Sequence, residues 1–139
     1  MGIRIRQLSF RMATPNPTEG ELALLRVLWS RKAPMTVREV HAQLSRDKDT
    51  AYTTVLKMLT IMADKGLVRR DESERSHTYL AMDAEPVVQG SLLKDLMRRA
   101  FSGSALTLVQ RAIADDVASA DDLDAIAKLI AQAKAKRRA

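Results

Sequence analysis

The residues best suited to chemistry on a ligand form one short run, Tyr52-Thr53-Thr54-Val55-Leu56-Lys57. Small hydroxyl side chains allow close approach to phosphates and base edges, to which they donate hydrogen bonds, and they can contact thymine methyl groups. Lys57 lies one helical turn beyond Thr53, where a cation reaches a purine edge or the backbone. The run therefore indicates the first turns of a helix that enters a DNA groove.

Helix capping is the alternative reading of the same hydroxyl groups. Asp49 or Thr50 is expected to cap this helix, and one of the hydroxyls from Thr50 to Thr54 then has a structural role only. Capping needs one hydroxyl, whereas the run supplies three. The surplus favours contact with a ligand.

Basic residues continue into the segment that follows. Residues 67–70 and 77–80 are expected to be short strands around a polar tip, which makes a β-hairpin, or wing. Its arginines suit phosphate, although two of the three can instead pair with Asp71, Glu72 and Glu74. Ser45 and Arg46 are weaker phosphate candidates. The expected DNA-contacting residues are Arg38, Ala51, Tyr52, Thr53, Thr54, Lys57, Arg69, Arg70, Arg75 and His77.

Catalytic and metal sites lack a supporting pattern. The chain has no cysteine, so disulfides, thiolate metal sites and cysteine catalysis are excluded. His41 and His77 lie on different expected elements, and neither has a helical i, i+4 partner for a metal. The acids at 115–116 and 121–124 fit a turn and a helix N-terminus. We expect no enzyme, no metal and no cofactor.

Two capping boxes position these groups. Thr18 and Glu21 open a first helix that ends near residues 31–32, and Thr36 and Glu39 open a second. The third helix ends at Gly66, where glycine adopts the left-handed conformation without steric cost. With the hairpin they predict a mainly α winged helix-turn-helix with a small β-wing over residues 18–82. The expected core positions are Leu22, Leu25, Leu28, Trp29, Val37, Val40, Leu44, Val55, Met58, Leu59 and Met62.

Residues 83–133 are expected to form a helical dimerisation domain of three amphipathic helices. Pro86 opens the first, Gly103 ends it, and the segment 119–122 caps the last. A segment this short, with few aromatic residues, can hardly form a hydrophobic core by itself. Its apolar faces are therefore expected to pack against a second copy. Packing onto the chain's own first domain is the alternative. The expected dimerisation residues are Val88, Leu92, Leu96, Phe101, Leu106, Val109, Ile113, Leu123, Ile126, Leu129 and Ile130.

The charge distribution suits a polyanionic partner. Residues 1–82 hold 14 Lys and Arg against 9 Asp and Glu, and residues 83–139 hold 9 against 8, for a net charge of +6. Residues 1–17 are expected to be a flexible basic arm, and residues 134–139 a basic tail. No apolar run is long enough for a membrane span or a signal peptide, so we expect a soluble, cytoplasmic protein without membrane insertion.

Four segments resemble the penicillinase repressor family of the BlaI/MecI type. They are 17–22 (Pro-Thr-Glu-Gly-Glu-Leu) with 27–29 (Val-Leu-Trp), 36–40 (Thr-Val-Arg-Glu-Val), 51–56 (Ala-Tyr-Thr-Thr-Val-Leu) and 65–68 (Lys-Gly-Leu-Val). The resemblance covers roughly residues 16–115. It implies a winged helix with a helical dimerisation domain, and a homodimer that represses β-lactamase or related genes from a palindromic operator in double-stranded DNA. It also implies relief of repression through a membrane sensor-protease, with cleavage in the dimerisation domain.

Three departures from the family pattern bear on mechanism. The C-terminal cysteine cluster of copper-responsive members is missing, so copper sensing is not expected. Arg111-Ala112 stands in the region where staphylococcal repressors are cut at an Asn-Phe bond. Separately, Ile61 stands where many members have a basic residue. A different operator sequence is therefore expected. The alternative from another class is a protein-interaction module that uses the third helix for docking; apolar docking would be insensitive to salt, unlike DNA binding.

Overall fold

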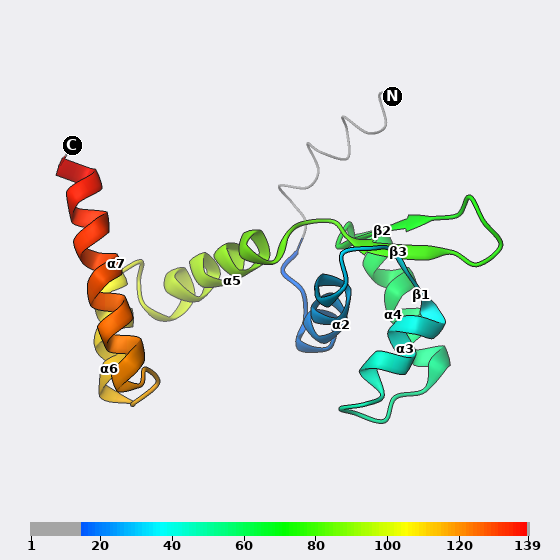
Figure 1. Cartoon of the computed structure of the whole chain (residues 1–139), viewed down its shortest axis with the longest axis horizontal. Coiled ribbons are helices and arrows are strands. Elements are labelled where there is room, and N and C mark those ends of the chain that lie inside the picture. Colours follow the sequence, from blue (N-terminus) through cyan, green and yellow to red (C-terminus); the bar gives the residue numbers. More distant parts are fainter. Residues whose placement is uncertain (1–14, 139) are drawn as a thin grey trace. The chain divides into compact units, whose positions relative to one another are not determined.

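The computed structural model describes residues 15–138, so most of the expected basic arm at 1–17 lies outside the described residues. The chain divides into two units, the first ending at Leu92 and the second beginning at Leu93. The fold is mainly α with one small antiparallel sheet, as predicted (Figure 1). Its elements are α2 (Glu19–Ser30), β1 (Met35–Thr36), α3 (Val37–Leu44), α4 (Tyr52–Lys65), β2 (Val68–Asp71), β3 (Thr78–Ala81), α5 (Glu85–Ala100), α6 (Ala105–Ala114) and α7 (Ala120–Arg138).

Both predicted capping boxes are present. The Thr18 amide donates to Glu21 Oε1 at 2.9 Å, and the Glu21 amide donates to Thr18 Oγ1 at 3.2 Å. The Thr36 and Glu39 pair repeats the same two distances at the start of α3. Each box satisfies two amides that the first turn of a helix leaves without partners, so these helix starts are determined locally.

The start of α4 differs from the prediction. Ala51 is the N-cap residue, and no side chain of the described residues caps the helix, so the expected cap by Asp49 or Thr50 is wrong. The Thr50 hydroxyl instead donates to the Lys48 carbonyl at 3.1 Å, because the turn between the helices uses it for its own closure. The other end is as predicted. Gly66 has φ of +85°, and the next amide donates back to the Met62 carbonyl at 2.9 Å.

The core of the first unit gathers one side of each of its first three helices. In α4, Val55, Leu59 and Met62 are fully buried and Met58 is partly buried, as the helical spacing predicted. In α2 the stripe is shifted toward Leu24, which is fully buried but was not predicted, whereas Leu22 and Trp29 are only partly buried. The buried cluster is Leu24, Leu25, Val27, Leu28, Met35, Val37, Val40, Val55, Leu59, Met62, Leu67, Val68 and Tyr79.

The sheet has the strand order β1-β3-β2, and β2 and β3 form the predicted hairpin about one residue later than expected. Figure 1 shows the hairpin projecting beyond the three helices. Strand β1 was not predicted. It pairs Met35 with Tyr79, and Tyr79 is 2% exposed at the centre of the sheet. A two-residue strand has no periodicity of its own, so only its pairing with β3 defines it.

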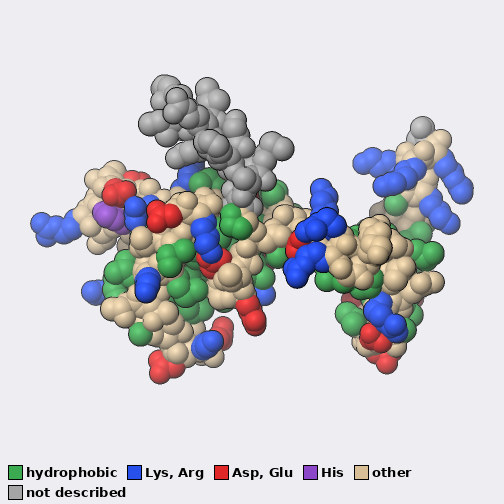
Figure 2. Space-filling model, turned by 180° about the vertical axis from the view of Figure 1, so that it is seen from behind, with side chains coloured by type: hydrophobic (Ala, Val, Ile, Leu, Met, Phe, Trp, Pro, Cys, Tyr) green, Lys and Arg blue, Asp and Glu red, His purple; other side chains and the backbone are tan. Residues whose placement is uncertain are grey.

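The three predicted C-terminal helices are present, and α7 continues through the basic residues to Arg138. No residue of α6 or α7 is buried within the single chain. Figure 2 shows hydrophobic side chains on the surface of these helices and basic ones gathered toward the end of α7. Val88 of α5 differs, because it is only 9% exposed. None of the described helices is long and apolar enough to cross a membrane.

One ion pair joins the start of α2 to the end of α4. Glu21, which is 5% exposed, accepts a hydrogen bond from Lys65 Nζ at 2.8 Å in addition to its capping bond. Burial alone would raise the pKa of Glu21. The Lys65 ammonium and the Thr18 amide outweigh it, and the pKa lies below the ordinary value of 4.5. The first turn of α2 is thereby joined to the last turn of α4.

Replacing Glu21 by Gln is expected to destabilise the fold by about 1–3 kcal/mol at neutral pH, because the partly buried lysine loses its counter-charge. A carboxyl whose pKa is lower in the folded state than in the unfolded state stabilises the fold at pH values above its unfolded-state pKa. The difference in free energy of unfolding between the wild type and Glu21→Gln should therefore be complete above pH 4.5 and shrink as the pH falls below it. Chemical denaturation across that range measures it. Glu19→Gln, an exposed acid of the same helix turn, is the control, and an equal effect there would refute the assignment.

Candidate nucleic-acid interface

The side of α4 opposite the core carries polar residues, flanked by exposed Leu56 and Ile61. Thr53, Lys57 and Asp64 are exposed, and their spacing along the helix places them on one side, away from buried Val55 and Leu59. Thr60 lies on the same side, and its hydroxyl donates to the Leu56 carbonyl at 2.9 Å. Sequence reasoning named Thr53 and Lys57, and the structure places both on the exposed side of α4.

The hydroxyl groups in the first turn of α4 are available to a ligand. Tyr52 is 44% exposed, and Thr53 and Thr54 are exposed. Within residues 15–138 the side chains of these two threonines make no hydrogen bond, and α4 has no side-chain cap. The capping role expected for one of the hydroxyls is therefore wrong. Ala51, just before them, is exposed and adds little bulk at the helix start.

A groove of about 560 Å³ separates the start of α4 from the hairpin. It brings together Arg38 of α3, Tyr52 of α4, and Arg75 and His77 of the hairpin, four of the predicted contact residues from three separate elements. Leu56 also lines it and was not predicted, although it lies one turn after Tyr52. The full lining is Thr36, Val37, Arg38, Tyr52, Leu56, Arg75, Ser76, His77 and Tyr79.

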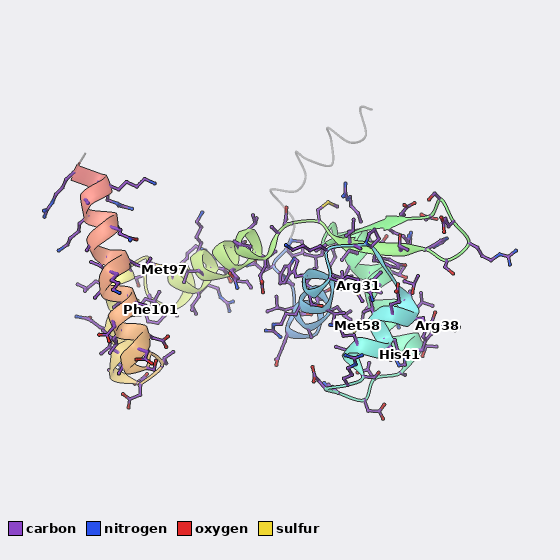
Figure 3. All side chains as sticks on the ribbon, viewed as in Figure 1. Arg31, Arg38, His41, Met58, Met97 and Phe101 are labelled. Carbon is purple, nitrogen blue, oxygen red and sulfur yellow. The ribbon has the colours of Figure 1, made fainter. Side chains whose placement is uncertain are left out.

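The cations predicted to contact DNA, which lie on α3, α4 and the hairpin, fall into two groups. Arg38, Lys57, Arg69 and Arg75 are exposed and make no ion pair or side-chain hydrogen bond within the described part of the chain. Figure 3 shows Arg38 on α3; Arg31, which precedes it in the chain, donates instead to Glu39 at 2.6 Å. Unpaired exposed cations retain their full attraction for phosphate.

Arg70 belongs to the second group. Its guanidinium lies 3.3 Å from the Glu72 carboxylate. Hydrogen bonding with the Tyr79 side chain, together with Glu72, raises the pKa of Arg70 above its usual value. Asp71 is also engaged, since it accepts from the Ser73 amide at 2.9 Å, and this bond lowers its pKa. One of the pairings considered from the sequence thus forms, and Arg70 is less available to phosphate than Arg69.

Ser45, a weaker phosphate candidate from the sequence, does not suit that role. Its Oγ is buried and has no hydrogen-bond partner among residues 15–138, and the residue is the C-cap of α3. A buried hydroxyl cannot reach a phosphate without local rearrangement. Arg46, the other weaker candidate, is exposed.

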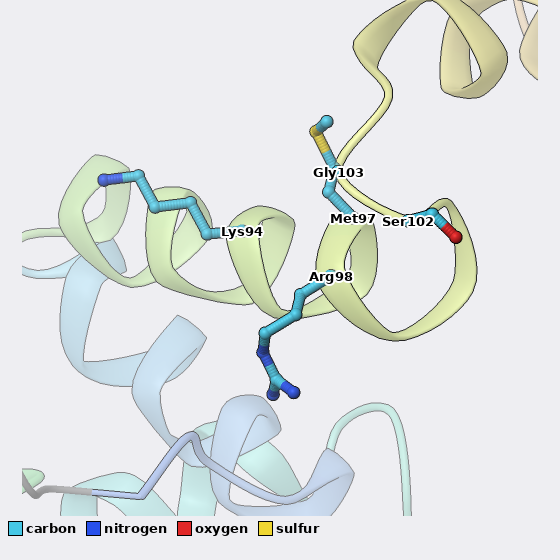
Figure 4. A pocket seen from close by; sticks show the side chains of 5 residues that line it. All are labelled: Lys94, Met97, Arg98, Ser102 and Gly103. Carbon is cyan, nitrogen blue, oxygen red and sulfur yellow. The ribbon is translucent and has the colours of Figure 1, made fainter.

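A second hollow, of about 490 Å³, lies at the end of α5 and is lined by Lys94, Met97, Arg98, Ser102 and Gly103. Figure 4 shows the side chains of Lys94, Met97 and Arg98 pointing in different directions rather than converging. It contains none of the predicted contact residues. Among residues 15–138, no three His, Asp or Glu side chains gather as metal ligands.

The groove and the exposed side of α4 together offer hydroxyl donors, unpaired cations and an apolar side chain on a rigid helix. This combination suits phosphate contacts from the cations and base-edge contacts from the helix.

The family model described as penicillinase repressor matches residues 17–132. Transcriptional regulator BlaI from two strains of Mycobacterium tuberculosis is 34% identical over 116 residues, which cover 83% of this chain and 83% of the relative. A solution structure of the Bacillus licheniformis BlaI monomeric form in complex with the blaP half-operator aligns with a TM-score of 0.45 and 24% identity, over 52% of this chain and 87% of that one.

Proposed function

Because the chain belongs to the penicillinase repressor family, whose members are transcriptional regulators, we propose that it represses transcription as a homodimer bound to a palindromic operator. The family match over residues 17–132 carries the class of function. The protein is a DNA-binding repressor and not an enzyme.

In the proposed complex α4 lies in the major groove. Tyr52, Thr53, Thr54 and Lys57 contact base edges and flanking phosphates, and the small side chain of Ala51 allows the helix start to approach closely. This assignment is supported by the exposure of those side chains and by the burial of the opposite side of α4.

The phosphate contacts in this proposal come from the unpaired cations. Arg38, Arg75 and His77 line the 560 Å³ groove between α4 and the hairpin, and Arg69 lies on β2. Arg70 is a weaker contact because Glu72 already faces it. The wing carries acids as well as arginines, so its main proposed phosphate contact is the unpaired Arg75, near the minor groove.

The dimer is proposed to form through the helices of residues 83–133. In the single chain Leu106 is 68% exposed and Leu129 is 63% exposed, and a soluble protein rarely leaves such an apolar surface uncovered. Val88 contributes little, since it is already buried. Val87 is an exposed apolar side chain of α5 that the sequence-based set left out.

Regulation is proposed to act on the same helical part. A membrane sensor-protease pathway is the proposed route of induction, and β-lactamase or related genes are the proposed targets. Arg111 and Ala112 lie in the last turns of α6, where a helical backbone would have to open before a protease could cut it. Because the proposed repressor acts on operator DNA, we propose that it resides in the cytoplasm.

Removing the outward-facing side chains of α4 should weaken specific binding. Thr53→Ala combined with Lys57→Ala is expected to lower affinity for a duplex that the wild-type protein selects from a random-sequence library, by about 1–3 kcal/mol for each base-reading side chain removed. Mobility-shift titration measures this, with Lys48→Ala, an exposed lysine of the α3–α4 turn, as control. Unchanged affinity of the double variant would remove α4 from the reading surface.

Salt dependence separates DNA binding from protein docking. Binding of the selected duplex should weaken steeply with added salt, and Arg38→Ala should reduce the slope of log K against log salt by about 0.9 for each phosphate that the arginine neutralises. Arg26→Ala, an exposed arginine of α2, is the control and should leave the slope unchanged. A salt-independent interaction would favour the protein-interaction alternative.

The proposed dimer interface gives a separate prediction. Wild-type protein at micromolar concentration should scatter light with twice the mass of one chain, and Leu129→Glu should yield monomers, because a charge in an apolar interface is costly. Val117→Glu is the control, since Val117 is 74% exposed between α6 and α7 and lies outside the expected interface. A monomeric wild type would refute the dimer without affecting the assignment of α4.

A further inference from the structure

The start of α4 lacks the side-chain N-cap that commonly fixes the first turn of a helix. Among residues 15–138 no side chain caps its N-terminus, and neither Asp49 nor Thr50 supplies the missing bond. The Thr54 and Val55 amides donate to the Ala51 carbonyl, so the first turn begins only once Ala51 is in place. Some other contact has to fix the backbone that leads into α4.

His41 of α3 makes that contact. Its Nε2 lies 2.6 Å from the Thr50 carbonyl oxygen, across the turn that joins the two helices. A carbonyl oxygen only accepts, so Nε2 carries the proton and donates it. Both the neutral ring in this tautomer and the charged ring can make this bond. Figure 3 shows His41 on α3.

The same ring also packs against the first residue of α4. The His41 and Tyr52 rings meet edge to face, with centroids 5.7 Å apart and planes at 74°. Tyr52 lines the groove beside the hairpin, so its orientation shapes the surface offered to DNA. One half-buried side chain therefore holds both the backbone before α4 and the first side chain of α4.

We propose that His41 is a positioning residue that sets the start of α4 and the Tyr52 ring for reading DNA. This inference rests on the proposed function. His41 was considered from the sequence only as a metal ligand, which it is not placed to be among the described residues. Its spacing from Thr50 carries no local signature, because the contact spans the whole turn.

Two substitutions separate the two contacts of His41. His41→Phe keeps a ring against Tyr52 but removes the donor to Thr50. His41→Gln keeps an amide donor and removes the ring. For the duplex selected by the wild-type protein, His41→Phe should bind about tenfold more weakly, the scale of one hydrogen bond, and His41→Gln should recover part of that affinity. Affinity for poly(dI-dC), which reports phosphate contacts, should change less than about twofold for both variants.

A second readout needs no DNA. Amide hydrogen exchange at Thr54 and Val55 should become faster in His41→Phe, while exchange at Leu59 in the middle of α4 should be unchanged. Ala42→Gln, at an exposed neighbouring position of α3, is the control and should alter neither measurement. Equal faster exchange at all three amides would indicate general destabilisation and overturn the positioning role.

The outcomes also separate this inference from the proposed function. If the wild-type protein selects no duplex, the proposed function fails, and amide exchange alone decides the role of His41. If the wild type binds but His41→Phe binds equally well with unchanged exchange, the positioning role is wrong and the proposed function stands. A lower salt slope in His41→Phe would make His41 a direct phosphate contact instead, which also overturns the proposal.

Discussion

The structure depends on burying one side of α4 while leaving the other side free. Val55, Leu59 and Met62 are fully enclosed, and each such side chain stabilises the fold by about 1.5–3 kcal/mol relative to exposure. A helix of 14 residues is marginal in water on its own, so this packing is what maintains it. The free side can then carry threonine and lysine, which contribute nothing to the core. The Glu21 to Lys65 pair secures the far end of the same helix.

The parts of the fold that follow from neighbouring residues could be predicted from the sequence. The capping boxes at Thr18 and Thr36 and the stop at Gly66 each involve atoms within a few residues, and all three are present. Strand β1 could not be predicted, because it exists only through pairing with β3. The start of α4 was predicted wrongly for a related reason. Polar residues before a helix suggest a cap, but here the Thr50 hydroxyl closes the turn and its carbonyl accepts from α3.

The candidate site shows the same division between residue type and residue environment. Which side chains of α4 are exposed could be predicted, since helical spacing separates Thr53 and Lys57 from the buried Val55 and Leu59. Which cations are free could not be predicted by type alone. Arg69 and Arg70 are adjacent and chemically identical, yet successive residues of a strand point to opposite faces. Arg70 is the one paired in register with Tyr79, and it lies two residues before Glu72 on the same side.

In the proposed dimer the exposed apolar helices connect stability to function. In the proposed dimer each winged helix would contact one half-site, and two joined copies would bind far more tightly because the second contact becomes intramolecular. Folding of these helices then gains from association, since no residue of α6 or α7 is buried in one chain. Any event that opens α6 would remove the apolar surface that joins the copies. Both half-sites would be released together, although neither recognition helix had changed.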